Sequence, residues 1–321
     1  MQKSYSNLVH TRVPGTLGGL LVLVGFVLIG MAVGNILAIV ILALLTSSDA
    51  NSITGLLTTL FAEPEKVPNG WLLMMVLQGT VHFFSYLLPS LLYWFYMEKK
   101  GFQDFNFKNK PVASIWFLVC ILVLVFIPVN SFFIDLNSKM TFPDSLSGIE
   151  NWMRDKEDQN AMLTSFMTSY TQVGQLIIAL IVVVLLPAVG EEVLFRGIIQ
   201  RKLAQHWINP HVAIWVSAAI FSAIHFQFFG FLPRMILGAL FGYLYFWSGR
   251  LSISILAHFI NNGFILVMMF LRNIKVLDID IEEKEVMPVA AMIASAVLTI
   301  GIIYEIRKKS GTKPVLRTGN Q

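Results

Sequence analysis

The second half of the chain carries six polar side chains within long apolar stretches. They are Glu191, Glu192, Arg196, His225, His258 and Asn262. Ionisable side chains inside membrane spans cost free energy, so they are rare there and usually functional. A carboxylate can act as a general base, and His and Asn side chains can hold a water molecule or stabilise an oxyanion. These residue types therefore indicate acid–base chemistry on a bound water.

The spacing of these residues separates the two neighbouring carboxylates. Glu192 and Arg196 are four residues apart, so on a helix they lie on one face and can form an ion pair. Glu191 then points about 100° away from Glu192. His258 and Asn262 are also four residues apart and project to one side of their helix. The pattern predicts that one carboxylate is held by arginine while the other is available for chemistry.

The polar residues on the three predicted helices lie at similar distances from the predicted cytoplasmic edge of the membrane. With a rise of about 1.5 Å per residue, Glu191 lies roughly 15 Å from Arg201 at the predicted cytoplasmic edge. The same arithmetic puts His225 roughly 21 Å, and His258 and Asn262 roughly 12 and 18 Å, from that edge. Four polar groups on three helices thus fall within about 10 Å of depth. We expect them to line one cavity.

Composition decides where such helices lie. The chain has 321 residues, of which 56% are hydrophobic and only 13% charged. Soluble domains are about 45–50% apolar and about 25% charged. A soluble globular enzyme, a disordered chain and a disulfide scaffold are excluded. The single Cys120 can form no internal disulfide, and no interleaved Arg and aromatic patch indicates nucleic-acid binding.

The predicted fold is all-α, a polytopic transmembrane bundle of about eight spans. The uncharged runs that define them are Val13–Ser48, Val67–Met97, Pro111–Ile134, Gln159–Gly190, His211–Phe229, Met235–Gly249, Leu251–Leu271 and Val286–Tyr304. A break at Gly34-Asn35 would change the count by one. Fifteen of the 23 Lys and Arg residues lie in one alternate set of loops and ends, so both termini should be cytoplasmic.

The order and spacing of the motifs resemble one known family. Glu-Glu-x-x-x-Arg at residues 191–196, Phe-x-x-x-His at 221–225 and His-x-x-x-Asn at 258–262 are similar to the motifs of the CAAX-protease and bacteriocin-processing family (CPBP or Abi). That family includes CAAX prenyl endoproteases and lysostaphin-resistance-like proteins. The resemblance implies an intramembrane endopeptidase. The motifs cover residues 191–262, under a quarter of the chain. Together with the predicted spans and loops, they divide the chain into residues 1–150 (N-terminal spans and outer loop), 159–272 (catalytic core) and 273–321 (outer acidic loop, last span and basic cytoplasmic tail).

The resemblance also implies a role for each site residue. Glu191 would be the general base, and His225 would hold the attacking water with it. His258 and Asn262 would bind the oxyanion or the scissile carbonyl. Glu192 and Arg196 would form a supporting ion pair.

Metal dependence stays open at this stage. The family is widely labelled a metalloprotease or metalloendopeptidase, and Glu191, His225 and His258 could ligate zinc. However, the chain has no His-Glu-x-x-His motif, and a neutral Asn is an uncommon zinc ligand. The same groups also suit a metal-free glutamate protease. No cofactor is therefore assigned with certainty.

Two further functions compete with proteolysis. One is a non-catalytic scaffold or immunity protein of the same fold, and the other is a proton-coupled transporter, because Glu and His chains also relay protons. For the protease, the expected partners are the bilayer and a membrane-embedded or lipid-anchored peptide. A compact chain without a retention tail favours a bacterial cell membrane. His82 stands alone among aromatic residues, which favours a structural role.

Overall fold

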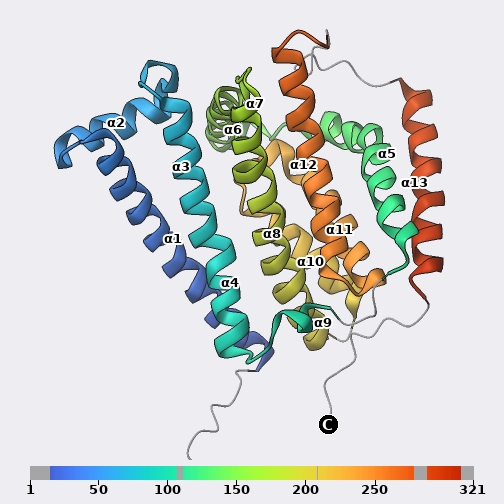
Figure 1. Cartoon of the computed structure of the whole chain (residues 1–321). Helices are drawn as coiled ribbons and strands as arrows, with labels where there is room; N and C mark the ends of the chain where they lie inside the picture. The colour runs from blue at the N-terminus through green and yellow to red at the C-terminus, as the bar shows by residue number, and fades with distance from the viewer. Residues whose placement is uncertain (1–14, 107–110, 208, 278–287, 312–321) are drawn as a thin grey trace, which may run out of the picture.

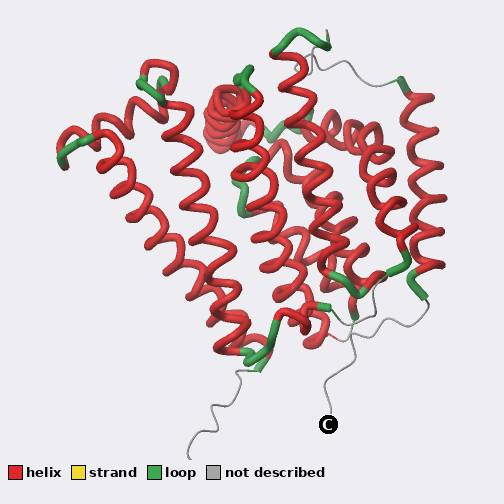
Figure 2. Tube along the Cα trace, in the orientation of Figure 1, coloured by secondary structure: helices red, strands yellow, loops and turns green. Residues whose placement is uncertain are grey.

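A computed structural model of the chain describes residues 15–106, 111–207, 209–277 and 288–311. Every regular element within these ranges is helical, and the helices form one bundle (Figures 1 and 2). The predicted all-α, polytopic bundle is confirmed. The acidic stretch at residues 278–285 lies outside the described residues, as do the terminal segments 1–14 and 312–321.

Seven helical stretches are long and apolar enough to cross a membrane. They are α1 (Thr16–Thr46), α3 to η4 (Gly70–Met97), α5 (Ala113–Ser138), α7 to α9 (Val173–His206), η9 and α11 (Phe228–Ser248), α12 (Leu251–Asn273) and α13 (Val289–Lys309). Helix α1 is continuous through Gly34 and Asn35, so no break occurs there. Large apolar side chains on α1 and α13 remain exposed in the bundle, which is where lipid would contact them.

The eighth expected span is a shorter helix. The sequence predicts one helix over the run His211–Phe229, but α10 (Pro210–Ala223) has only 14 residues. The chain then turns at Phe226, whose φ is 51°, before η9 begins at Phe228. The run carries no charge that would have indicated this turn. In Figure 1 the first residues of α1 and the last of α13 lie at the same end of the bundle, and their cytoplasmic orientation stays a prediction.

Helix α1 packs closely against the second span through two small residues. Gly30 and Gly34 are four residues apart, the spacing of small residues that lets membrane helices approach closely. A Cβ atom added at Gly30 would overlap the backbone carbonyl oxygen of Phe84, and one at Gly34 would lie 2.7 Å from the Phe84 Cβ. Phe84 lies in η3 (Phe83–Leu87), two residues after His82. Helix α1 therefore fixes the position of this part of the second span.

Wide helical turns occur in both spans that meet at the centre of the bundle. The π-helical segment η3 follows α3 (Gly70–His82), and η7 (Leu180–Leu185) precedes α8 (Leu186–Glu192). Each precedes a proline, Pro89 or Pro187, which removes a backbone donor and crowds the preceding turn. Two further π-helical segments are η4 (Tyr93–Met97), at the end of the second span, and η8 (Val193–Gln200), which follows α8. Such π segments are frequent at functional sites because they alter the direction of the side chains around them.

Helix α6 (Ser147–Thr168) lies across one end of the bundle, opposite the end where α1 begins (Figure 1). The Trp71 indole donates to the Met167 carbonyl at 2.9 Å. The Phe229 backbone N–H donates to the Glu157 carboxylate at 3.0 Å. Helix α6 thus joins α3 to the turn that precedes α11.

We predict that Gly30→Ala destabilises the protein by about 1–3 kcal/mol, because the added methyl group forces α1 away from η3. The matched control is Gly25→Ala on the same helix, where an added Cβ meets nothing within 4 Å. That control should be neutral or stabilising by roughly 0.5–1 kcal/mol, since Ala is the better helix former. Unfolding of the detergent-solubilised variants measures both. Equal stability of the two variants would contradict the close packing of α1.

Candidate active site

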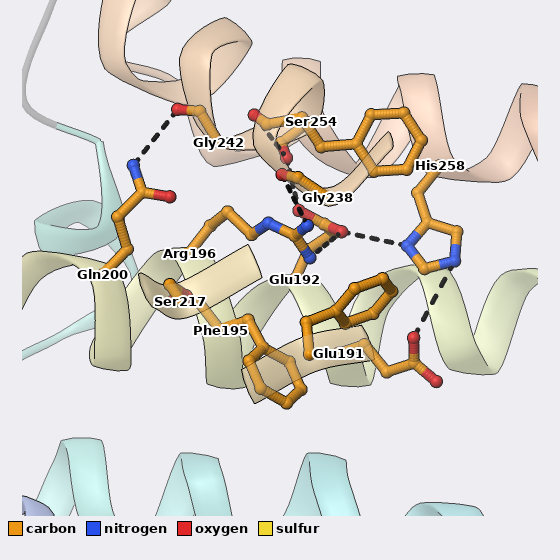
Figure 3. A network of polar contacts seen from close by, with 12 residues as sticks. Glu191, Glu192, Phe195, Arg196, Gln200, Ser217, Gly238, Gly242, Ser254 and His258 are labelled. Atoms are coloured by element: carbon orange, nitrogen blue, oxygen red, sulfur yellow. Dashed lines mark hydrogen bonds and ion pairs between the residues drawn. The ribbon is translucent and has the colours of Figure 1, made fainter. Parts of the chain in front are cut away.

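The Glu192 carboxylate is at the centre of the buried polar network in Figure 3. Its side chain is fully buried, and Arg196 Nη1 donates to Oε1 at 2.6 Å. His258 Nδ1 lies 2.9 Å from the same oxygen, and the Ser254 hydroxyl donates to Oε2. Arg196 also donates to the Gly238 carbonyl at 2.9 Å. A buried ion pair is favourable only when its remaining groups are hydrogen-bonded, and this network satisfies that condition.

Aromatic rings enclose the Arg196 guanidinium. It lies 4.6 Å from the ring centroid of Phe221 and 5.7 Å from that of Phe241. The Phe241 ring also stacks on the His258 imidazole, with centroids 5.4 Å apart. These contacts leave the guanidinium and the imidazole little freedom to move away from Glu192. Phe221, the first residue of the Phe-x-x-x-His motif, therefore packs directly against this network.

Glu191 has a different environment from Glu192, although the two are adjacent in α8. Its side chain is 6% exposed and accepts no hydrogen bond from any described residue. Its Oε2 lies 3.9 Å from His258 Nε2, and its Oε1 lies 3.9 Å from His82 Nε2. A separation of 3.9 Å is too long for a direct hydrogen bond but allows a water or a substrate oxygen to bridge the two atoms. Glu191 is therefore the carboxylate that remains available.

The hydrogen bonds of two histidines define their tautomers. His258 Nδ1 faces a carboxylate, and His225 Nδ1 lies 2.8 Å from the Phe221 carbonyl, so each Nδ1 must carry the hydrogen. In a neutral ring the other nitrogen then has a lone pair and no hydrogen. Toward the space beside Glu191, neutral His258 is consequently a hydrogen-bond acceptor.

The structure brings together some of the predicted site residues and not others. Glu191, Glu192, Arg196 and His258 are neighbours. The Phe221 ring lies between His225 and His258, with centroids 5.1 and 6.1 Å away, but no hydrogen bond or ion pair among the described residues joins His225 to Glu191.

Asn262 follows His258 by one turn of α12, which places it on the same side of that helix. Its side-chain oxygen accepts from Asn261 at 3.0 Å. It also makes no hydrogen bond to Glu191 among the described residues.

Two residues of the site were not predicted as members of it. Ser254 is four residues before His258, on the same face of α12, so the helical spacing held a signal for its contact with Glu192. His82 was expected to be structural, but it lies beside Glu191. Its position in the middle of an apolar span was the available signal, because histidines are rare there.

The donor set does not form a metal site. Within the described ranges, no group of three or more His, Cys, Asp or Glu side chains is arranged to hold a metal ion. His258 could offer only its Nε2 to a metal, because its Nδ1 is bonded to Glu192, and no hydrogen bond or ion pair among the described residues brings His225 to Glu191 as a third ligand. We therefore derive no chemical step through a metal at Glu191, His225 and His258.

A buried, unengaged carboxylate beside two histidines inside a membrane bundle defines a class of membrane-embedded site suited to acid–base chemistry. Residues 173–264 match the family model of type II CAAX prenyl endopeptidase Rce1-like proteins. This range contains all three motifs, so the resemblance to the CAAX-protease (CPBP) family is confirmed over it.

The chain is also similar to the uncharacterized protein YpbD of Bacillus subtilis (strain 168). The two are 34% identical over 85 residues, which make up 25% of this chain and 40% of YpbD. The similarity to this relative thus covers less than half of either protein. No solved structure gave a significant match.

We predict that Arg196→Met lowers stability by about 3–5 kcal/mol, because it leaves the Glu192 charge buried without its cation. The control is Lys139→Met. Lys139 forms an ion pair of the same i,i+4 spacing with Asp135, but its side chain is 66% exposed. Exposed pairs are worth about 0–1 kcal/mol. Unfolding in detergent compares the two, and a loss for Arg196→Met no larger than for Lys139→Met would show that the pair is not structurally important.

Proposed function

We propose that this protein is an intramembrane endopeptidase that hydrolyses peptide bonds with a water activated by Glu191. One observation carries the proposal. Of two adjacent buried carboxylates, Glu192 is engaged by Arg196, Ser254 and His258, whereas neither oxygen of Glu191 accepts a hydrogen bond from a described residue. A buried carboxylate without a partner costs stability, and such a cost is usual at functional sites. The match of residues 173–264 to CAAX prenyl endopeptidases supports the same chemistry.

In this mechanism a water binds on the Oε2 side of Glu191. Glu191 takes one proton, and His258 Nε2 accepts a second hydrogen bond and orients the water. The oxygen attacks the scissile carbonyl carbon and forms a tetrahedral oxyanion. Collapse of this intermediate breaks the C–N bond, and Glu191 returns its proton to the leaving amine.

The oxyanion needs hydrogen-bond donors, and neutral His258 does not supply one at Nε2. In our account Asn262 donates its amide N–H to the oxyanion, as the family resemblance implies. The water has two hydrogens, so the Nε2 lone pair of His225 can hold it only as an alternative to that of His258, beside Glu191. This assignment differs from the expectation from the motifs that His258 itself binds the oxyanion, and the reason is its Nδ1 hydrogen bond to Glu192.

The position of Glu191 limits the substrate. It lies within the span Val173–His206, so a scissile bond must enter the membrane region to reach it. We propose peptides that are embedded in the membrane or anchored to it, whether or not they are prenylated. The similarity to a Bacillus subtilis protein favours a bacterial cell membrane as the location.

We predict that Glu191→Gln lowers the cleavage rate by about 10²–10⁴-fold, because it removes the base and keeps the shape of the side chain. The assay uses purified, detergent-solubilised protein with a quenched peptide library and a CAAX peptide with and without a farnesyl group. Glu65→Gln is the control, since Glu65 is exposed in η2 (Pro64–Lys66), the short 3₁₀ helix after α2 (Ala50–Ala62). Its cleavage rate should equal that of the wild type.

Two results would contradict the proposal. Cleavage by Glu191→Gln at the wild-type rate would exclude Glu191 as the base. Absence of cleavage by folded wild type, together with a wild-type cellular phenotype of Glu191→Gln, would favour the scaffold function.

The same assay with a zinc chelator tests whether cleavage depends on a metal. Unchanged cleavage is expected, and a loss restored by added zinc would show that water activation requires a metal.

A further inference from the structure

His82 is a buried histidine with an unsatisfied nitrogen next to the candidate base. It ends α3, near the middle of the span Gly70–Met97, and is 5% exposed. Its ring stacks on Tyr86 with centroids 4.5 Å apart. Its Nε2 has no hydrogen-bond partner among the described residues and lies 3.9 Å from Glu191 Oε1. An unsatisfied polar group inside a bilayer is costly, so a purely structural histidine is not expected to leave Nε2 free.

The surrounding helices hold this ring in place. Gly190 immediately precedes Glu191, and a Cβ atom added there would lie 3.4 Å from His82 Nε2. The ring nitrogen therefore lies directly against α8. On the other side of the second span, Gly30 and Gly34 let α1 pack onto Phe84, two residues after His82. The position of His82 is thus determined by close backbone packing on both sides.

His82 approaches Glu191 from the side opposite His258. His82 faces Oε1, whereas His258 faces Oε2, each with its Nε2 at 3.9 Å. Two oxygen atoms, one from water and one from a substrate carbonyl, can therefore be held on the two sides of one carboxylate. Hydrolysis of a peptide bond requires these two oxygens close together.

The tautomers of the three histidines determine which ring can donate a hydrogen bond at Nε2 and which can only accept one. His225 and His258 each use the Nδ1 hydrogen for a bond within the protein, so their neutral rings accept at Nε2. His82 Nε2 has no such commitment and can carry the hydrogen. Of the three rings, His82 is therefore the one suited to donate to a developing negative charge while remaining neutral.

We propose that His82 is a further catalytic residue of this site. Its Nε2–H donates to the oxygen of the scissile carbonyl and to the oxyanion that forms beside Glu191. This inference rests on the proposed hydrolytic function. The donor keeps its proton throughout, so the proton transfers between water, Glu191 and the leaving amine are unchanged.

The test compares variants that keep or remove a donor at the Nε2 position. His82→Leu and His82→Phe remove it, and Phe retains an aromatic ring against Tyr86. His82→Gln keeps an amide N–H at about the position of Nε2. For the apolar variants we expect kcat to fall about 10²–10³-fold with KM nearly unchanged, as for loss of an oxyanion donor. His82→Gln should recover most of the lost kcat.

The control is His211→Leu. His211 is the first histidine of α10 and contacts Tyr243, with its Nδ1 2.9 Å from the Tyr243 hydroxyl. Its kcat and KM should stay at wild-type values. Thermal unfolding of every variant in the same detergent shows that the compared proteins are folded, and having two apolar variants keeps the test usable if one of them does not fold.

Three outcomes would overturn the inference, and they are distinguishable. If wild type cleaves in a Glu191-dependent manner and a folded apolar variant cleaves equally fast, His82 has no catalytic role and the proposed function stands. If His82→Gln is as slow as the apolar variants, His82 is not acting as a donor. If wild type shows no Glu191-dependent cleavage, the proposed function and this inference both fail.

Discussion

The arrangement of the site depends on one buried interaction, the engagement of Glu192 by Arg196, Ser254 and His258. It joins α8 and η8 to α11, through Gly238, and to α12. Removing a carboxylate and a guanidinium from water costs several kcal/mol per ion, and the cost is offset only while every partner stays in place. The network therefore fixes the relative positions of three helices, and with them the ring of His258. A change at any of its members is expected to alter the site as well as the stability.

Glu191, the carboxylate next to Glu192, lies outside this hydrogen-bond network. Glu191 is buried next to the network but outside it, with His82 on one side and His258 on the other. Neither of its oxygens accepts a hydrogen bond from a described residue, which is unfavourable for folding but leaves both oxygens able to accept a hydrogen bond, and then a proton, from water. The close approach of α1 to η3 and of His82 to Gly190 shapes the opposite wall. The protein thus combines a fully satisfied polar network with an adjacent unsatisfied group.

Most of the membrane helices and part of the site could be predicted from the sequence. The features that could not be predicted were missed for physical reasons. Long uncharged runs identify membrane helices reliably, because lipid imposes length and apolarity on each span separately. The ion pair of Glu192 and Arg196 could also be predicted, because residues four apart in one helix lie on the same face. The turn after Ala223 was missed because it lies in a run without charges or breakers. The contact of His82 with Glu191 was missed because it joins spans that are about 110 residues apart in sequence, and a packing of that kind leaves no periodic signal. The hydrogen-bonding role of His258 also needed the structure, since it depends on which nitrogen meets Glu192.

The central claim is that adjacent carboxylates have separate roles, Glu191 in chemistry and Glu192 in structure. The most direct measurement is a paired comparison of Glu191→Gln and Glu192→Gln, in which unfolding free energy and cleavage rate are determined on the same purified samples. We predict that Glu191→Gln loses cleavage and is at least as stable as wild type, because an unpartnered buried charge is removed. Glu192→Gln should be clearly destabilised, because Arg196 loses its counter-ion. A destabilised Glu191→Gln with near-normal cleavage, alongside a stable but inactive Glu192→Gln, would contradict this account.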